Sequence, residues 1–102
     1  MEFIEAPIFT KYIHSYLKDD DYSSLQWHLA LHPETGDLIP GSGGLRKVRW
    51  ITEGRGKRGG IRIIYYFHPA ENQIWLLTVY AKNEIENLPL DILRKIREEL
   101  EK

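Results

Sequence analysis

Three segments with the composition of β-strands follow one another in the second half of the chain. They span residues 45–51, 61–67 and 74–80, and all are rich in Ile, Val, Tyr and Trp. The connections between them cover only residues 52–60 and 68–73. Parallel neighbours need a crossover of a dozen or more residues, usually a helix, so these connections are too short. We therefore predict that the three strands form an antiparallel sheet.

Helical patterns flank this block on both sides. After a short strand at Phe3 and Ile4, Pro7 suits the first turn of a helix, and Asp21 suits the N-cap of a second helix that ends at His32 before Pro33. Apolar residues recur at helical spacing in three groups: Ile8, Phe9, Tyr12, Ile13, Tyr16 and Leu17; Tyr22, Leu25 and Leu29; and Leu88, Ile92, Leu93, Ile96 and Leu100. We predict one α+β domain over residues 1–102, in the order strand, helix, helix, three strands, short C-terminal helix, with the N-terminal helical hairpin packed on the sheet.

The net charge of −1 conceals a strong segregation of charge along the chain. Between residues 46 and 62 a single anion, Glu53, stands among seven cations: Arg46, Lys47, Arg49, Arg55, Lys57, Arg58 and Arg62. Such a concentration creates a local field that attracts polyanions. The chain has no cysteine, no bilayer-length apolar run and no basic, apolar N-terminal leader. We therefore expect a cytoplasmic protein without disulfides and without a membrane partner.

Strand periodicity predicts where these cations point. Successive strand residues alternate between faces, so Lys47 and Arg49 share one face while Val48 and Trp50 share the other. If the first two strands pair, Arg62 can join Lys47 and Arg49 on a common surface, and the glycine-rich loop of residues 53–60 can approach a phosphate chain closely. The alternative is a solvated basic hairpin, with cations placed to prevent edge-to-edge pairing of sheets.

Other patterns in the sequence carry less information. Trp50, Tyr65, Tyr66 and Tyr80 could stack on nucleobases, although for Tyr65, as for Phe67 and Trp75, a place in the core is expected instead. Residues 54–59 match G-x-G-x-x-G but lead into a strand, so the dinucleotide-binding context is lacking. His28 and His32 have a spacing that can hold zinc, yet no third ligand is evident. We expect neither a metal nor a cofactor.

The order of elements and three central segments resemble the RelE/HigB toxins of bacterial type II toxin–antitoxin modules, within the RelE/ParE superfamily. The resemblance covers essentially the whole chain and rests on residues 44–49, 56–66 and 77–84. It implies a RelE/ParE-like fold and a ribosome-dependent mRNA interferase that works without metal. In that reaction the 2′-hydroxyl attacks the adjacent phosphate. A base, a set of cations and an acid assist the attack, the growth of phosphorane charge and the departure of the 5′-oxygen.

The resemblance also implies roles for individual residues. Lys47 and Arg49 match a basic pair on the first of the three strands, where one of them, Lys47 in preference, would be the base, and Arg62 would bind the scissile phosphate. Lys82 and Glu84 match the polar tail of the last strand. Contacts to RNA or the ribosome are expected from Arg46, Arg55, Lys57, Arg58, Tyr80 and Asn83.

Two departures from the family pattern concern the acid. Many RelE proteins have an arginine where this chain has Asn83, and a tyrosine within the stretch 84–90, where this chain has none. Tyr80, Lys82 and Glu84 all stay open as the group that protonates the leaving oxygen.

The resemblance leaves two other functions open. One is a ParE-like poison of DNA gyrase without nuclease activity, and the other is a non-catalytic RNA-binding protein. The expected partners are the ribosome, mRNA and a cognate antitoxin of the helix-turn-helix type, through which alone the toxin would reach operator DNA.

Overall fold

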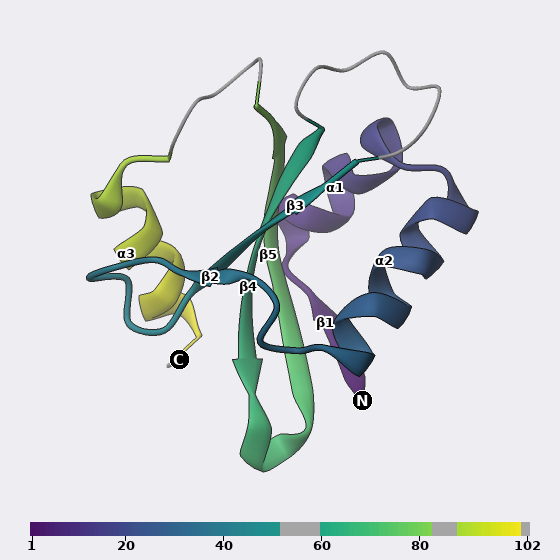
Figure 1. The fold of residues 1–102 in the computed structure, drawn as a ribbon. Coiled ribbons are helices and arrows are strands. Elements are labelled where there is room, and N and C mark those ends of the chain that lie inside the picture. The colour runs from purple at the N-terminus through teal and green to yellow at the C-terminus, as the bar shows by residue number, and fades with distance from the viewer. Residues whose placement is uncertain (52–59, 83–87, 101–102) are drawn as a thin grey trace.

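The computed structural model describes residues 1–51, 60–82 and 88–100. Five strands and three α-helices follow in the order β1 (Glu2–Glu5), α1 (Pro7–Tyr16), α2 (Asp19–Leu31), β2 (Asp37–Leu38), β3 (Arg46–Trp50), β4 (Ile61–His68), β5 (Gln73–Ala81) and α3 (Leu90–Glu99), with a 3₁₀ turn at Pro69–Glu71. The α1–α2 hairpin lies on one side of the sheet and α3 on the other (Figure 1). No helix in these three described ranges is long and apolar enough to cross a bilayer.

The sheet has the strand order β1-β5-β4-β3-β2. β3, β4 and β5 are joined as antiparallel neighbours, as their short connections predict. The sheet as a whole is mixed, because β1 runs parallel to β5, with Phe3 beside Ile74. The expectation of a purely antiparallel sheet is therefore wrong at this edge: the α1–α2 hairpin and three further strands separate β1 from β5, and this long connection permits a parallel pair.

The larger core lies between the sheet and the N-terminal hairpin. Phe9, Ile13 and Leu17 recur every four residues along α1 and are almost completely buried. They pack with α2 and with one face of the sheet through side chains that include Leu25, Leu29, Val48, Ile61, Ile63, Tyr65, Ile74, Leu76 and Val79. This face carries the alternate positions of β3 and β4, so the opposite positions are left for the other side.

A second, smaller cluster forms under α3. Leu93 of α3 packs with Leu45, Ile64, Leu77 and Tyr80, while Tyr66, Trp75 and Ile96 border them. Two hydrogen bonds hold α3 against the chain before β3: the Nε atoms of Arg94 and Arg97 donate to the Gly41 and Gly43 carbonyls at 3.2 and 2.8 Å. The Arg97 guanidinium also lies over the Tyr66 ring, 4.7 Å from its centroid. α3 therefore covers only part of this face of the sheet, which is opposite the helical hairpin, and does not cover the end at which Arg62 lies.

Tyr65 fixes the connection between α2 and β2. Its hydroxyl accepts a hydrogen bond from the Gly36 N–H at 2.9 Å and donates one to the Pro33 carbonyl at 2.8 Å. A Cβ atom at residue 36 would lie 2.8 Å from Tyr65 Cε1, so glycine is needed for this close approach. The connection is thereby tied to the centre of the sheet, and β2 can pair with β3 at Lys47 and Arg46.

Most of the expected element boundaries agree with the structure. Pro7 opens α1, α2 ends before His32, and Pro89 precedes α3. The prediction that Asp21 caps the second helix is wrong, since α2 begins at Asp19 with Lys18 at its N-cap. Asp19, Asp20 and Asp21 instead occupy the first turn, where negative charge is stabilised by the helix dipole. The two-residue strand β2 was not expected from the sequence.

Candidate functional site

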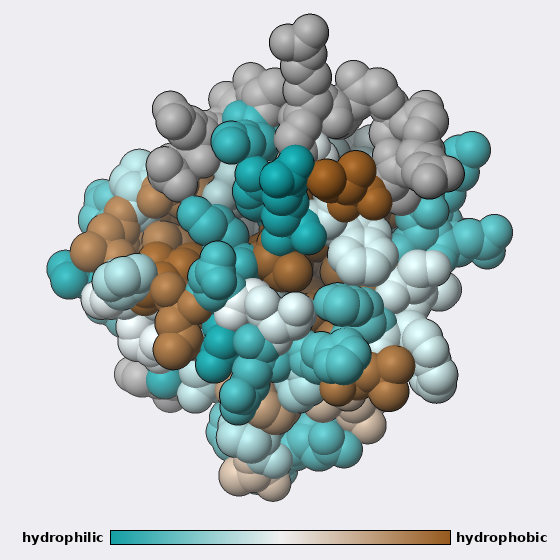
Figure 2. Space-filling view, in the orientation of Figure 1, coloured by the Kyte–Doolittle hydropathy of each residue, from teal (hydrophilic) through white to brown (hydrophobic). Residues whose placement is uncertain are grey.

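Lys47, Arg49 and Arg62 lie on one face of the sheet, here called the cationic face. Arg49 and Arg62 are direct cross-strand partners in the β3–β4 ladder. Lys47 precedes Arg49 by two residues on the same strand and therefore points to the same side. Figure 2 shows hydrophilic side chains in the middle of the visible surface, where β3 lies in Figure 1, with hydrophobic side chains to the left, where α3 lies. The expected convergence of these three cations is thus present in the backbone register.

The cationic face brings two positive charges into direct cross-strand proximity. Like charges directly opposite each other on neighbouring strands are destabilising, and Arg49 and Arg62 stand in that relationship. The side chains differ in exposure: Arg49 is exposed, while Lys47 and Arg62 are half-buried. A cation that is partly withdrawn from water interacts more strongly with a nearby anion, because the effective dielectric constant is lower there. The cationic face therefore suits an anionic group that spans β3 and β4.

Tyr80 adjoins the cationic face on the third strand. It is the cross-strand partner of Arg62 on β5, so three neighbouring strands contribute Arg49, Arg62 and Tyr80 in one row. Tyr80 is only 4% exposed and belongs to the cluster under α3. Burial raises the pKa of its phenol, and the Arg62 guanidinium opposes that rise. With so little of its ring exposed, Tyr80 offers a poor surface for stacking a nucleobase, and its expected role as an RNA contact stays a prediction.

The other predicted site residues are distributed differently. Arg46 points away from the cationic face, and its Nη1 atom donates to the carbonyls of Glu34 and Gly36 at 3.1 and 2.8 Å. Lys82 follows β5 directly, two residues after Tyr80, and is exposed. Five further predicted residues lie outside the described ranges: Arg55, Lys57, Arg58, Asn83 and Glu84.

The aromatic predictions are confirmed in part. Tyr65 is fully buried, as expected, and Phe67 and Trp75 are half-buried against the two cores. The ring of Trp50 packs on His28 with 5.5 Å between centroids, and His28 lies 5.3 Å from His32. No cluster of three or more His, Asp or Glu side chains that could hold a metal occurs within residues 1–51, 60–82 and 88–100.

The sequence groups Tyr12 and Tyr16 with the other apolar residues of the first helix, and in the structure Tyr16 packs against the core while Tyr12 is exposed. The apolar residues from 8 to 17 form two rows, and the row of Phe9, Ile13 and Leu17 is the one that is fully buried in the core. Ile8 and Tyr12 remain 47% and 42% exposed. The signal was available in the sequence, because six apolar positions over ten residues cover more of a helix surface than one buried stripe requires.

No model of a known protein family matches the sequence. Among solved structures, the chain is similar to the E. coli toxin RelE, in a variant with two arginines replaced by alanine and in the free state. The two chains superpose with a TM-score of 0.62 at 13% sequence identity, over 94% of this chain and 95% of that chain. The fold is RelE-like.

The similarity to RelE extends over the part of the chain that carries the cationic face. The match covers both chains almost from end to end, so the helical hairpin, the sheet and α3 all belong to the shared architecture. At 13% identity the match establishes the fold, and the chemistry has to be argued from this chain's own residues.

Proposed function

We propose that this chain is the toxin of a type II toxin–antitoxin module and acts as a ribosome-dependent mRNA interferase. The observation that carries the proposal is the alignment of Lys47, Arg49 and Arg62 on one sheet face of a RelE-like fold. A cleavage site for RNA without metal needs preorganised cations where negative charge grows in the transition state. The cross-strand pair Arg49–Arg62 provides two such groups next to each other.

The chemistry assigned to this site is an internal transesterification. The 2′-oxygen loses its proton and attacks the adjacent phosphorus, the P–O5′ bond breaks, and the 5′-oxygen takes up a proton. The products are a 2′,3′-cyclic phosphate and a 5′-hydroxyl. Arg62 and Arg49 stabilise the phosphorane oxygens, and Lys47 on the same face is the base.

The acid in this scheme is Lys82. Tyr80 is buried, which disfavours it as a proton donor to solvent-exposed RNA, and Glu84, which lies outside the described residues, stays the alternative acid. Lys82 is exposed directly after β5, two residues beyond the partner of Arg62, so it borders the same row of side chains. An ammonium group at this position can also bind the phosphate electrostatically before it gives up its proton.

The experiment that tests the proposal uses purified full-length protein, ribosomes and a defined message. We expect new 5′ ends inside codons that are being translated, and no cleavage of the same RNA without ribosomes. Arg62→Ala should abolish cleavage in a folded protein, whereas Lys95→Ala, which removes one exposed cation from α3, should not. A folded Arg62→Ala protein with full activity would refute the assignment.

The same assay separates the competing functions. Intact mRNA together with inhibited DNA supercoiling by gyrase would support the ParE-like alternative. Intact mRNA with retained RNA binding would indicate a non-catalytic protein. The proposal also implies three partners in the cytoplasm: the ribosome, mRNA and a cognate helix-turn-helix antitoxin, which would contact operator DNA.

A further inference from the structure

A groove runs along the outer edge of β5 beside α1. Its volume is about 240 Å³, and its walls are formed by Ile8, Tyr12 and Tyr16 on one side and Leu88 on the other. The floor is residues 78–80 of β5. β1 pairs with β5 only as far as Leu76, so within the described parts of the chain the rest of β5 has a strand neighbour on its β4 side alone.

The groove is continuous with the cationic face through Tyr80. This residue lines the groove and is also the cross-strand partner of Arg62. Neighbouring strands are about 4.8 Å apart, so the groove begins one strand beyond the cationic pair. A phosphate on Arg49 and Arg62 would therefore leave the next part of an RNA strand within reach of α1.

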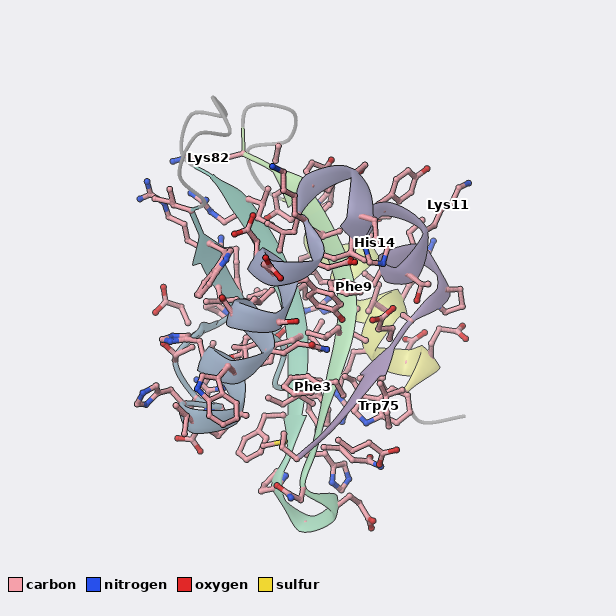
Figure 3. All side chains as sticks on the ribbon, turned by 90° about the vertical axis from the view of Figure 1, so that its right-hand side faces the viewer. Phe3, Phe9, Lys11, His14, Trp75 and Lys82 are labelled. Carbon is pink, nitrogen blue, oxygen red and sulfur yellow. The ribbon has the colours of Figure 1, made fainter. Side chains whose placement is uncertain are left out.

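The described part of α1 brings positive charge to one wall of the groove. α1 contains no acidic residue. The Nζ atom of Lys11 lies 5.4 Å from the centroid of the Tyr12 ring and brings a positive charge to the groove wall. In Figure 3 Lys11 lies at the upper right of the molecule and Lys82 at the upper left, on opposite sides of α1. Aromatic rings combined with cations are the usual surface for single-stranded nucleic acid.

We propose that this groove binds one base of the RNA strand whose phosphate lies on the cationic face, with the Tyr12 ring as the stacking surface. The inference rests on the proposed function and extends it to sequence preference. Phosphate contacts position a strand but do not distinguish its bases, so selectivity needs a separate contact of this kind. The volume, below the range of about 300–1,000 Å³ usual for drug-sized ligands, suits a single base.

An extended peptide is the competing occupant, because peptides can add to an open strand edge. The open part of β5 is short, from Leu77 to Ala81, and half of the groove wall is aromatic. Both features fit a flat ring better than a run of apolar side chains.

The test measures binding of full-length protein to fluorescent octanucleotides by anisotropy. One probe is a 2′-O-methyl RNA, which lacks the attacking hydroxyl and is not cleaved. The other is the same backbone with abasic positions. We expect Tyr12→Ala to weaken binding of the base-bearing probe by about 5- to 150-fold, the loss typical for one stacked base. Tyr12→Phe should bind as the unmodified protein does.

The abasic probe separates this inference from the proposed function. Tyr12→Ala should leave its affinity unchanged, while Arg62→Ala should weaken binding of both probes. Trp27→Ala removes an aromatic ring that is 70% exposed on α2, outside the groove, and serves as the matched control. Equal effects of Tyr12→Ala on both probes, or none, overturn the base-binding groove alone. If Tyr12→Ala leaves RNA binding unchanged and loses a co-purifying protein partner, the base-binding groove is overturned in favour of a peptide site. If Arg62→Ala binds the abasic probe normally, the proposed function is overturned.

Discussion

Arg49 and Arg62 face each other across the β3–β4 ladder, so the sheet holds two guanidinium groups as direct neighbours. Like charges directly opposite each other on neighbouring strands repel each other. Lys47 lies on the same face, and Asp37 of β2 is its cross-strand partner. Guanidinium groups held next to each other by a rigid sheet suit a ligand of the opposite charge, because both can act on the same anionic group.

The first prediction concerns stabilisation by an anion. Inorganic phosphate at ten times its dissociation constant should stabilise the fold by about 1.4 kcal/mol, because it binds only the native arrangement of the cations. For a domain of this size that corresponds to an increase in Tm of roughly 6–11 °C. Thermal unfolding followed by circular dichroism at constant ionic strength, with chloride as the reference salt, measures the effect.

The matched variants for this prediction remove one positive charge each. Arg62→Gln should lose most of the increase in Tm caused by phosphate. Lys95→Gln on the exposed side of α3 should keep it. An identical response of the two variants would show that phosphate acts through general salt effects.

The second prediction concerns the two hydrogen bonds by which Tyr65 holds the connection between α2 and β2. Tyr65→Phe removes the hydroxyl that contacts Gly36 and Pro33 and leaves two backbone groups without that partner. An unsatisfied buried polar group costs about 1–3 kcal/mol, so we expect Tyr65→Phe to lower the free energy of unfolding by at least that amount. Urea unfolding measures it. Tyr66→Phe changes the adjacent residue, which is half-buried and makes neither of these two hydrogen bonds. This control should change the free energy of unfolding by much less.

The third prediction concerns alkaline pH. The Tyr22 hydroxyl donates to Glu5 Oε2 at 2.6 Å, and the pKa of Tyr22 is raised well above its usual value by burial and by this carboxylate. Burial also raises the pKa values of Tyr65 and Tyr80. For a group whose pKa is raised in the folded state, the stabilisation is complete below the unfolded pKa, about 10 for tyrosine, and is lost as pH rises above it.

The stability of the protein should therefore decrease steeply above about pH 10. Each of the three tyrosines contributes a slope of up to about 1.4 kcal/mol per pH unit. Tyr22→Phe should make the slope shallower by one such contribution, measured by urea unfolding between pH 9 and pH 11.5. Tyr12→Phe, on the exposed side of α1, should leave the slope unchanged. The same slope in both variants would contradict the role given to Tyr22.

The strands could be predicted from the sequence because their signals are local. Composition and short connections identify β3, β4 and β5, and alternation places Lys47 and Arg49 together. The position of Arg62 required one further assumption, that the two strands pair, and the register confirms it. The resemblance to RelE is confirmed at the level of the fold by a match whose identity is only 13%.

Other features depend on contacts between distant residues and carry no local signal. The parallel pairing of β1 with β5 depends on chain direction after the helical hairpin. The role of Arg46, which contacts the Glu34 and Gly36 carbonyls, depends on the position of the preceding loop. Sequence patterns record the type of a side chain and its face, whereas these contacts depend on the complete arrangement of the elements.

The last prediction concerns Gly60, which directly precedes β4. Gly60 has a φ of +70°, and an added Cβ atom would lie 2.4 Å from the Trp50 carbonyl oxygen. The ends of β3 and β4 would have to separate, and this movement would displace Arg49 from Arg62. Gly60→Ala should therefore lower the free energy of unfolding by more than the roughly 1–3 kcal/mol of backbone strain alone, and it should reduce mRNA cleavage.

Gly41→Ala is the matched control for this prediction. Gly41 has a similar φ of +73°, but an added Cβ atom would meet no atom closer than 3.4 Å. The two substitutions share the cost of a positive φ, and only Gly60→Ala adds the steric conflict next to the cationic face. Urea unfolding gives the difference in stability, and cleavage measured at a temperature where both proteins are folded gives the effect on the site. Equal cleavage by the two variants would show that activity does not require the close pairing of β3 with β4 at Trp50.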